Sequence, residues 1–286
     1  MTAKLTVKEF FNRFPTDDAC LDHVMEVRFG MQHRCEACGQ ESTFHRLTER
    51  RAYSCARCGD HLYPCAGTIF QDSRTSLQLW FYAIYLFVVT RHGVSGKELE
   101  RNLGVTYKTA WRMAKQIRKL MTKAGNVDLL KGHIEIDEAY VGGRRSGGKR
   151  GRGAEGKFIV VAMKEREGNM KAAIIENVRT TTLRPLVNEN VEKGSTVSTD
   201  QLPSYRLLSA DGYAHGAVNH HKLEYVRGIH HVNGVEGFWK LFKDSVRSTH
   251  IHISKKYANQ YLGEFVFRSN YRGMQNAMFD LLIGAI

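Results

Sequence analysis

The chain has 286 residues, enough for about two domains with hydrophobic cores of their own. With 42% hydrophobic and 25% charged residues, its composition excludes intrinsic disorder as the default state. Because 42 Lys and Arg residues face 29 Asp and Glu residues, the net charge of +13 predicts a polyanionic partner, nucleic acid before an anionic membrane surface.

The N-terminal segment, MTAKLTVKEFFNRF, alternates charged and apolar residues. It has neither the apolar core nor the small-residue cleavage site of a signal peptide. We therefore expect the protein to remain in the cytoplasm of a bacterium, where thiols stay reduced and close cysteine pairs indicate metal binding.

Four of the six cysteines form two close pairs separated by sixteen residues. They are Cys35, Cys38, Cys55 and Cys58. This spacing is typical of a four-thiolate zinc ribbon, and Gly39 and Gly59 directly after the pairs permit the backbone to reverse. Because four protein ligands exclude water, we expect a structural zinc ion; the alternative is a small core of reduced cysteines. Cys20 and Cys65 lie outside the spacing and are expected to be ordinary thiols.

Helices are predicted for the next part of the chain, residues 69–128. The longest apolar run, residues 79–89, is too short to span a bilayer and predicts a buried helix. Residues 93–121 then follow a helix-turn-helix pattern with Gly104 at the turn and Thr106 as the N-cap of the second helix. The side chains expected to reach DNA from the start of that helix are Tyr107, Lys108, Thr109 and Arg112. A basic helix that is merely solvated is the alternative.

The third part, from about Gly132 onward, predicts an α/β domain with a mixed sheet. Its strands are expected at residues 133–137, 157–165, 170–178 and 195–200. Helical patterns occupy residues 182–191, a stretch beginning at Asn233, and a stretch from about Lys255 to Arg272.

Three acids of this part suit metal chemistry. Asp137 is predicted to end the first strand and Asp200 the fourth, and Glu236 lies in the first turn of a later helix. If the two strands pair in parallel, both aspartates meet at one sheet end, and a helix packed there could add Glu236. Such a group would hold two Mg²⁺ or Mn²⁺ ions for displacement at phosphorus.

Each acid also has a simpler interpretation. The aspartates would then be turn residues at the ends of strands, and Asn233 with Glu236 is close to a helix capping box. Glu135 and Glu138 are expected to be bystanders, because alternation along the strand should turn them in other directions than Asp137.

Basic residues surround these acids in the sequence. Lys240 and Lys243 follow Glu236 on one helical face, where they could hold phosphate; the alternative for Lys240 is an ion pair with Glu236. A glycine-rich loop after the first strand supplies further cations for salt-dependent contacts with the DNA backbone; the alternative is a merely solvated tether. They are Arg144, Arg145, Lys149, Arg150, Arg152 and Lys157.

The order of these motifs resembles a known family. The zinc ribbon is followed by GTIFQDSRTSLQLWFYAIYLF, HIEIDEAYVGGR, STD and HHVNGVEGFWKLFK, and this order resembles bacterial insertion-sequence DDE transposases of the IS1595 type over nearly the whole chain. The resemblance implies a retroviral-integrase-like, RNase H-like catalytic domain whose first two acids are Asp137 and Asp200. For the third position Asn233 matches an asparagine frequent in this group. Glu236, which thirty-five residues separate from Asp200, matches the general DDE spacing, and we favour it because it is charged.

The resemblance also implies an organisation and an activity. Residues 1–68 would carry the zinc ribbon, 69–128 the helix-turn-helix and 129–286 the catalytic domain. The protein would bind double-stranded DNA at terminal inverted repeats and in the target. It would cut and join that DNA with Mg²⁺ or Mn²⁺, as at least a dimer and without a membrane partner. The alternatives are a DNA-binding regulator without catalysis and a metal-dependent nuclease that never joins.

Overall fold

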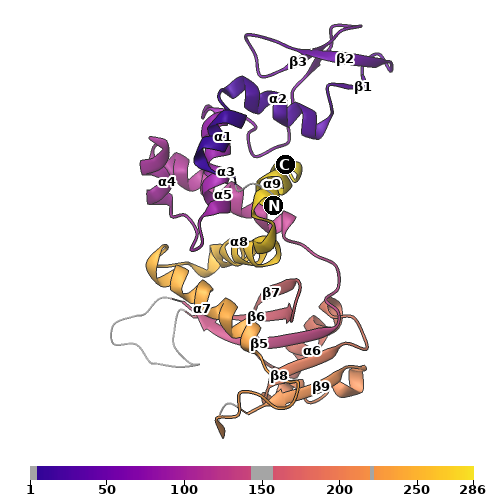
Figure 1. The fold of residues 1–286 in the computed structure, drawn as a ribbon, viewed down its shortest axis with the longest axis vertical. Coiled ribbons are helices and arrows are strands. Elements are labelled where there is room, and N and C mark those ends of the chain that lie inside the picture. Colours follow the sequence, from indigo (N-terminus) through magenta and orange to yellow (C-terminus); the bar gives the residue numbers. More distant parts are fainter. Residues whose placement is uncertain (1–4, 143–156, 220–221) are drawn as a thin grey trace. The chain divides into compact units, whose positions relative to one another are not determined.

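The computed structural model describes residues 5–142, 157–219 and 222–286. They form two compact units (Figure 1). The first unit comprises the described residues of Met1–Thr90, Gly96–Leu120 and Met274–Ile286. The second comprises those of Arg91–Ser95 and Met121–Gly273.

Helices of the first unit pack around aromatic side chains. They are α1 (Val7–Arg13), α2 (Asp17–Arg28), α3 (Leu77–Val89) and α9 (Gln275–Gly284). Helix α3 is buried along most of its length, as predicted, and both α2 and α9 pack against it. The rings of Phe14, Phe81 and Phe279 meet with centroids 4.9 to 5.8 Å apart. Within the part of the chain that the structure describes, no helix is both long and apolar enough to cross a membrane.

A small antiparallel sheet carries the cysteine pairs. Its strands are β1 (Gln32–Arg34), β2 (Glu41–Arg46), β3 (Tyr53–Cys55) and β4 (His61–Leu62), in that spatial order. Each strand is short, and few of their side chains are buried. The sheet therefore has little hydrophobic core of its own, the situation in which a small domain depends on a bound metal.

Two helices joined by a tight turn follow α3. Helix α4 (Gly96–Leu103) is followed by Gly104, whose φ of +64° is the left-handed conformation that glycine adopts without strain. Helix α5 (Tyr107–Ala124) begins after Thr106, whose Oγ1 accepts a hydrogen bond from the Thr109 amide at 3.4 Å. The helices and their turn lie where the sequence predicts them, and a DNA-reading role for α5 stays a prediction.

The second unit is built on a five-stranded mixed sheet. The strands are β5 (His133–Val141), β6 (Phe158–Glu165), β7 (Met170–Ile175), β8 (Thr196–Asp200) and β9 (Ala214–Val218), and their order is β7-β6-β5-β8-β9. β5, β6 and β7 are antiparallel neighbours, whereas β8 and β9 run parallel to β5. The mixed sheet predicted from the sequence is confirmed. Its edge strand β9 was missed, because AHGAV has low strand propensity.

Helices cover both faces of this sheet (Figure 1). Helices α7 (Asn233–Ser248) and α8 (Ala258–Tyr271) pack over β5, β6 and β7. Helix α6 (Thr180–Asn190) covers the opposite face, where it buries Leu183 and Val187 against Ile134 and Ile136 of β5. Short 3₁₀ turns occupy Pro203–Tyr205, Ser209–Asp211, Lys255–Tyr257 and Arg272–Met274. Since alternate residues of a strand point to opposite faces, the odd-numbered residues of β5 face α7.

Candidate active site and metal centre

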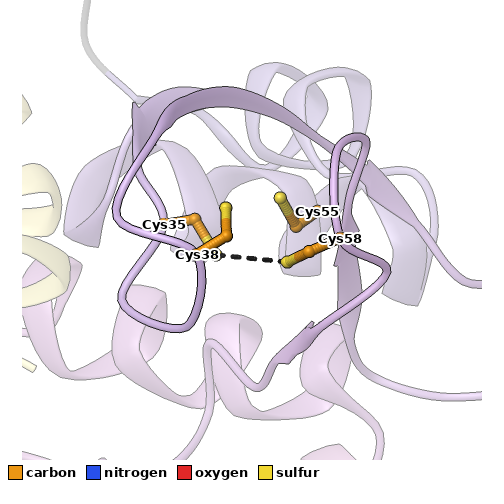
Figure 2. A group of neighbouring side chains, drawn as sticks. All are labelled: Cys35, Cys38, Cys55 and Cys58. Atoms are coloured by element: carbon orange, nitrogen blue, oxygen red, sulfur yellow. Dashed lines mark hydrogen bonds between the residues drawn. The ribbon is translucent and has the colours of Figure 1, made fainter.

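The four paired cysteines converge at one point of the small sheet. Figure 2 shows their side chains pointing toward one another from two facing turns. All four sulfur atoms lie within 4.8 Å of one another, and Cys35 Sγ and Cys58 Sγ are 3.7 Å apart. Thiolates at about 2.3 Å from one tetrahedral zinc ion are separated by about 3.8 Å. The cluster thus has the donor set and the spacing that a structural zinc ion needs.

The two turns that carry these cysteines have the same backbone geometry. In the first, the Gly39 amide donates to the Cys35 carbonyl at 2.9 Å; in the second, Gly59 donates to Cys55 at the same distance. Both glycines have positive φ, +68° and +77°, as the predicted backbone reversal requires. A contact with the Ser42 hydroxyl at 3.2 Å lowers the pKa of Cys55, which favours the thiolate form that binds zinc.

The remaining two cysteines are buried away from the cluster. Burial raises the pKa of Cys20 to about 12 and also raises the pKa of Cys65. Both are therefore protonated thiols at neutral pH, poor metal ligands and poor nucleophiles.

Carboxylates gather where β5 and β8 separate. Parallel pairing of the two strands stops at Glu135 and Ser198, and beyond that point the edge of β5 opens beside Asp200, the last residue of β8. Carboxylate oxygens of Asp137, Glu138 and Asp200 lie within 4.8 Å of one another. The parallel pairing predicted from the sequence brings the two aspartates together.

Asp137 does not end its strand. β5 continues to Val141, because its antiparallel pairing with β6 runs on to Phe158. Asp137 instead lies inside the strand, opposite Ala162. It lies beside Asp200 because the pairing of β5 with β8 stops at Ser198, so the acid group combines a residue from within β5 with the last residue of β8.

A pocket of about 280 Å³ contains the acid group together with two lysines. Its lining residues are Asp137, Glu138, Ala139, Tyr140, Lys157, Val178, Asp200 and Lys243. Burial lowers the pKa of Lys243 from its ordinary value, while the charge of Asp137 opposes that shift. The pocket thus combines oxygen ligands of the kind that Mg²⁺ and Mn²⁺ prefer with ammonium groups that can bind phosphate.

The raised pKa of Asp137 indicates a site that favours a bound cation. Burial and the neighbouring charge of Asp200 raise the pKa of Asp137 to about 6, although Trp239 Nε1 donates a hydrogen bond to its Oδ2 at 3.0 Å. Close carboxylates repel one another when ionised. A divalent cation would relieve this repulsion and take the place of the proton, so the acid group fits the hard metal ions predicted from the sequence.

Glu135 holds the start of helix α7. Its Oε2 accepts hydrogen bonds from the amides of Gly234, at 2.7 Å, and Val235, at 3.3 Å. Arg166 Nε lies 3.3 Å and His231 Nδ1 3.1 Å from Oε1, and the Glu135 side chain is only 2% exposed. The buried carboxylate therefore satisfies amides that a helix N-terminus leaves without partners inside the helix.

One prediction about these acids was wrong, and one alternative interpretation does not hold. Glu135 faces α7, as Asp137 does, because residues two apart along a strand point to the same face. The capping box of Asn233 and Glu236 is not formed either: α7 already begins at Asn233, and its N-cap residue, Val232, provides no side-chain hydrogen bond. Glu135 fills that role from the sheet.

Because Glu135 holds the first turn of α7, it determines which residue of the helix lies beside Asp137. Gly234 and Val235 lie at the level of Glu135, whereas Trp239 reaches Asp137. Glu236 is three residues from Trp239, about 4.5 Å along the axis, and Asn233 is six residues away, about 9 Å. The charge of Glu236 also helps to raise the pKa of Asp137, although its carboxylate is not among the three that lie within 4.8 Å.

Replacement of Glu135 should disturb this alignment. Glu135→Ala would remove the acceptor for two amides and leave Arg166 without its buried partner, at a cost of about 3 kcal/mol of unfolding free energy. Glu135→Gln keeps an acceptor oxygen and should lose less. Thermal unfolding of both variants measures the difference. Equal melting temperatures for Glu135→Ala and the wild type would show that Glu135 does not anchor α7.

Of the other predicted site residues, some line the pocket and others are exposed or lie outside the described residues. Lys243 lines the pocket, whereas Lys240 is exposed on α7 and is not one of its lining residues. Lys108 is exposed on α5. Arg112 donates to Ser73 Oγ at 3.2 Å and lies 5.7 Å over the Trp80 ring. The loop cations Arg144, Arg145, Lys149, Arg150 and Arg152 lie outside the described residues.

Two residues of the pocket region were not predicted to belong to it. Glu138 lies within the acid group, and the Tyr205 hydroxyl donates a hydrogen bond to it. Trp239 orients Asp137 from α7. The signal for Glu138 was present, since it directly follows Asp137, but alternation alone could not show that a longer side chain on the opposite face would reach the same pocket.

Sequence comparisons match the two segments of the chain that contain these sites. The profile of a transposase zinc-ribbon domain matches residues 15–61, which include all four cysteines of the cluster. The profile of the ISXO2-like transposase domain matches residues 129–270, which include the mixed sheet, the acid group and α7. This domain implies an RNase H-like fold, which the five-stranded mixed sheet fits.

Two curated proteins are similar to the chain. An uncharacterized protein in the transposable element ISH50 of Halobacterium salinarum is 28% identical over 275 residues, 89% of this chain and 91% of that protein. An uncharacterized transposase-like protein of Haemophilus influenzae is 30% identical over 97 residues, which cover 34% of this chain and 77% of that protein.

Proposed function

The chain belongs to the ISXO2-like transposases of the IS1595 type, and from this premise we propose that it binds the terminal inverted repeats of an insertion sequence and cuts and joins DNA in the pocket beside β5 and β8. The observation that carries the proposal is the meeting of Asp137 and Asp200 with Lys243 in one pocket. The three side chains come from β5, β8 and α7. A DNA-binding regulator would not require them to meet in one pocket.

The acids would hold divalent cations. Asp137, Asp200 and Glu236 are the proposed ligands, and the position of Glu138 allows it to bind a cation as well. When bound, Mg²⁺ or Mn²⁺ would supply an activated attacking oxygen and charge stabilisation for the leaving oxygen. Lys243 would bind the phosphate that is cut, because its ammonium group lines the same pocket.

The first unit would supply DNA binding. We propose that zinc stabilises the ribbon and that α4 and α5 form a helix-turn-helix, with Lys108, Thr109 and Arg112 near the DNA. Lys108 is exposed, as this role requires, whereas Arg112 would have to leave Ser73 to reach a base or a phosphate. Because two transposon ends must be paired, at least two protomers would act together.

Metal-dependent nicking of DNA tests the enzyme assignment. A labelled duplex that carries the inverted repeat flanking the gene should be cut at the end of the repeat with Mg²⁺ or Mn²⁺ and stay intact with EDTA. A protein that binds the duplex but never cuts it with either metal would be a regulator.

The third ligand can be identified by two substitutions. Glu236→Gln is expected to lower the cleavage rate by about 10²-fold, because it removes a charge near Asp137. Asn233→Ala should change the rate less than tenfold, since Asn233 lies about 9 Å along α7 from Trp239. Rates on the same labelled duplex decide between them. The reverse order of effects would assign the third position to Asn233.

A further inference from the structure

An exposed apolar loop connects β9 to α7. Four large apolar side chains within seven residues are more than half exposed: Leu223 (74%), Tyr225 (52%), Val226 (55%) and Ile229 (61%). We call residues 222–229 the apolar loop. In Figure 1 it belongs to the orange trace that follows β9 and precedes α7. A water-soluble surface has little reason to concentrate such residues in one short segment.

The strand that leads into the loop ends beside the acid group. The loop follows β9, whose last residue, Val218, is the partner of Asp200 in the parallel ladder, so the two backbones lie about 4.8 Å apart there. The next residue, Asn219, organises the start of the loop: its carbonyl accepts hydrogen bonds from the amides of Lys222 and Glu224, both at 3.0 Å. The apolar loop is thereby fixed next to a residue that we place in the catalytic pocket.

The far end of the loop is also held firmly. Arg227 and His230 exchange two backbone hydrogen bonds of 2.9 and 3.0 Å, which close a tight hairpin. His230 Nδ1 lies 2.8 Å from Ser198 Oγ, and its ring packs so closely on Gly216 that a Cβ there would overlap it. The ends are therefore tied to β8 and β9, while the side chains between them face solvent.

Folding does not account for Leu223. Its φ of +57° is a conformation in which glycine or asparagine has less strain than leucine, and the side chain is 74% exposed. A leucine at this position neither relieves backbone strain nor fills a core. An apolar side chain that is presented in this way is suited to contact a partner.

We propose that the apolar loop contacts an unstacked base of the DNA end that is cut, an inference that rests on the proposed function. Any phosphodiester held beside Asp200 places its adjoining bases near the start of the loop. Apolar side chains that insert beside bases hold them out of the stack, and an aromatic ring such as that of Tyr225 can stack on one.

The charges around the loop favour DNA over a second protein surface. Lys222 precedes Leu223, Arg227 lies between Val226 and Ile229, and Arg166 Nη2 donates to the Ile229 carbonyl at 2.9 Å. The acid of the loop, Glu224, folds back, with its Oε2 accepting from the Asn219 amide at 3.3 Å. Apolar side chains interspersed with cations can contact a base and the phosphates next to it.

The chain offers a matched pair of substitutions for the test. Leu223 and Ile251 are both exposed, 74% and 79%, and both have φ near +60°. Asparagine relieves strain at either position, so neither Leu223→Asn nor Ile251→Asn should destabilise the fold. Ile251 lies in the connection between α7 and α8, away from the apolar loop in sequence, and serves as the control.

Cleavage of paired and mismatched DNA ends tests the inference. On a fully paired terminal-repeat duplex, Leu223→Asn is expected to cut about 30-fold more slowly than the wild type, and Ile251→Asn at the wild-type rate. On a duplex with mismatches next to the cleavage site, Leu223→Asn should recover to within about threefold, because a mismatched base costs little to unstack. A fluorescent base analogue at that position should brighten with the wild type and not with Leu223→Asn.

The outcomes separate this inference from the proposed function. If the wild type cuts and Leu223→Asn cuts the paired duplex equally fast, the inference is overturned and the transposase assignment stands. A defect that persists equally on mismatched DNA, or one that accompanies loss of a dimer in solution, also overturns it. If the wild type cuts neither duplex with Mg²⁺ or Mn²⁺, the proposed function itself fails.

Discussion

Asp137→Asn and Asp200→Asn are each expected to lower metal-dependent cleavage and joining by about 10³-fold or more. Each substitution replaces a charged oxygen ligand with a neutral amide in a group whose carboxylates lie within 4.8 Å of one another. Both variants should still bind terminal-repeat DNA, because the residues proposed for recognition belong to the other unit. Rates on labelled duplex and binding by mobility shift measure the two effects separately.

Asp137→Asn should also make the metal-free protein more stable. The pKa of Asp137 rises from 3.8 to about 6 on folding, so the folded protein holds this proton more tightly and loses stability as pH rises from about 4 through 6. A neutral asparagine avoids this loss, worth up to about 3 kcal/mol above pH 6. The melting temperature in EDTA at pH 8 should therefore exceed that of the wild type. A variant that is less stable and inactive would indicate simple misfolding.

Loss of the zinc ion from the ribbon is expected to unfold the small sheet and abolish DNA binding. Cys38→Ser removes one of four thiolates from a sheet with little core, and structural zinc contributes about 10 to 16 kcal/mol to the folding of small zinc domains. The four-stranded sheet should unfold and terminal-repeat binding should be lost. Zinc content by atomic absorption and amide exchange of residues 32–62 measure the first result, and mobility shift measures the second.

Cys65→Ser is the control for this change. Cys65 is buried outside the four-sulfur cluster, so its replacement should leave one zinc ion per chain. If Cys38→Ser retained one tightly bound zinc ion per chain and native exchange, the cluster would not be the zinc site.

Spacing in the sequence predicted the parts of the molecule that local chemistry determines. The two cysteine pairs and their glycines form similar turns wherever they bind zinc, and the sulfur cluster has the expected geometry. Asp200 lies at its predicted strand end, and β5 pairs with β8 in parallel as expected.

Features that depend on the register of neighbouring elements could not be predicted in this way. The length of β5 follows from its pairing with β6, which extends the strand four residues past Asp137. The role of Glu135 depends on where α7 begins, a tertiary contact between residues 99 apart in the chain. Local patterns allowed a capping box within α7 as the simpler interpretation of Asn233 and Glu236, whereas a buried carboxylate from the sheet accepts hydrogen bonds from the first amides of the helix.

Sequencing of strand-transfer products tests the central claim most directly. Wild-type protein, Mg²⁺, a labelled terminal-repeat duplex and a plasmid target are incubated together, and the junctions are sequenced. We predict covalent joining of the 3′ end of the repeat to plasmid DNA, with none in EDTA or with Asp200→Asn. DNA that is bound and left intact, or ends that are cut and never joined, would contradict the assignment.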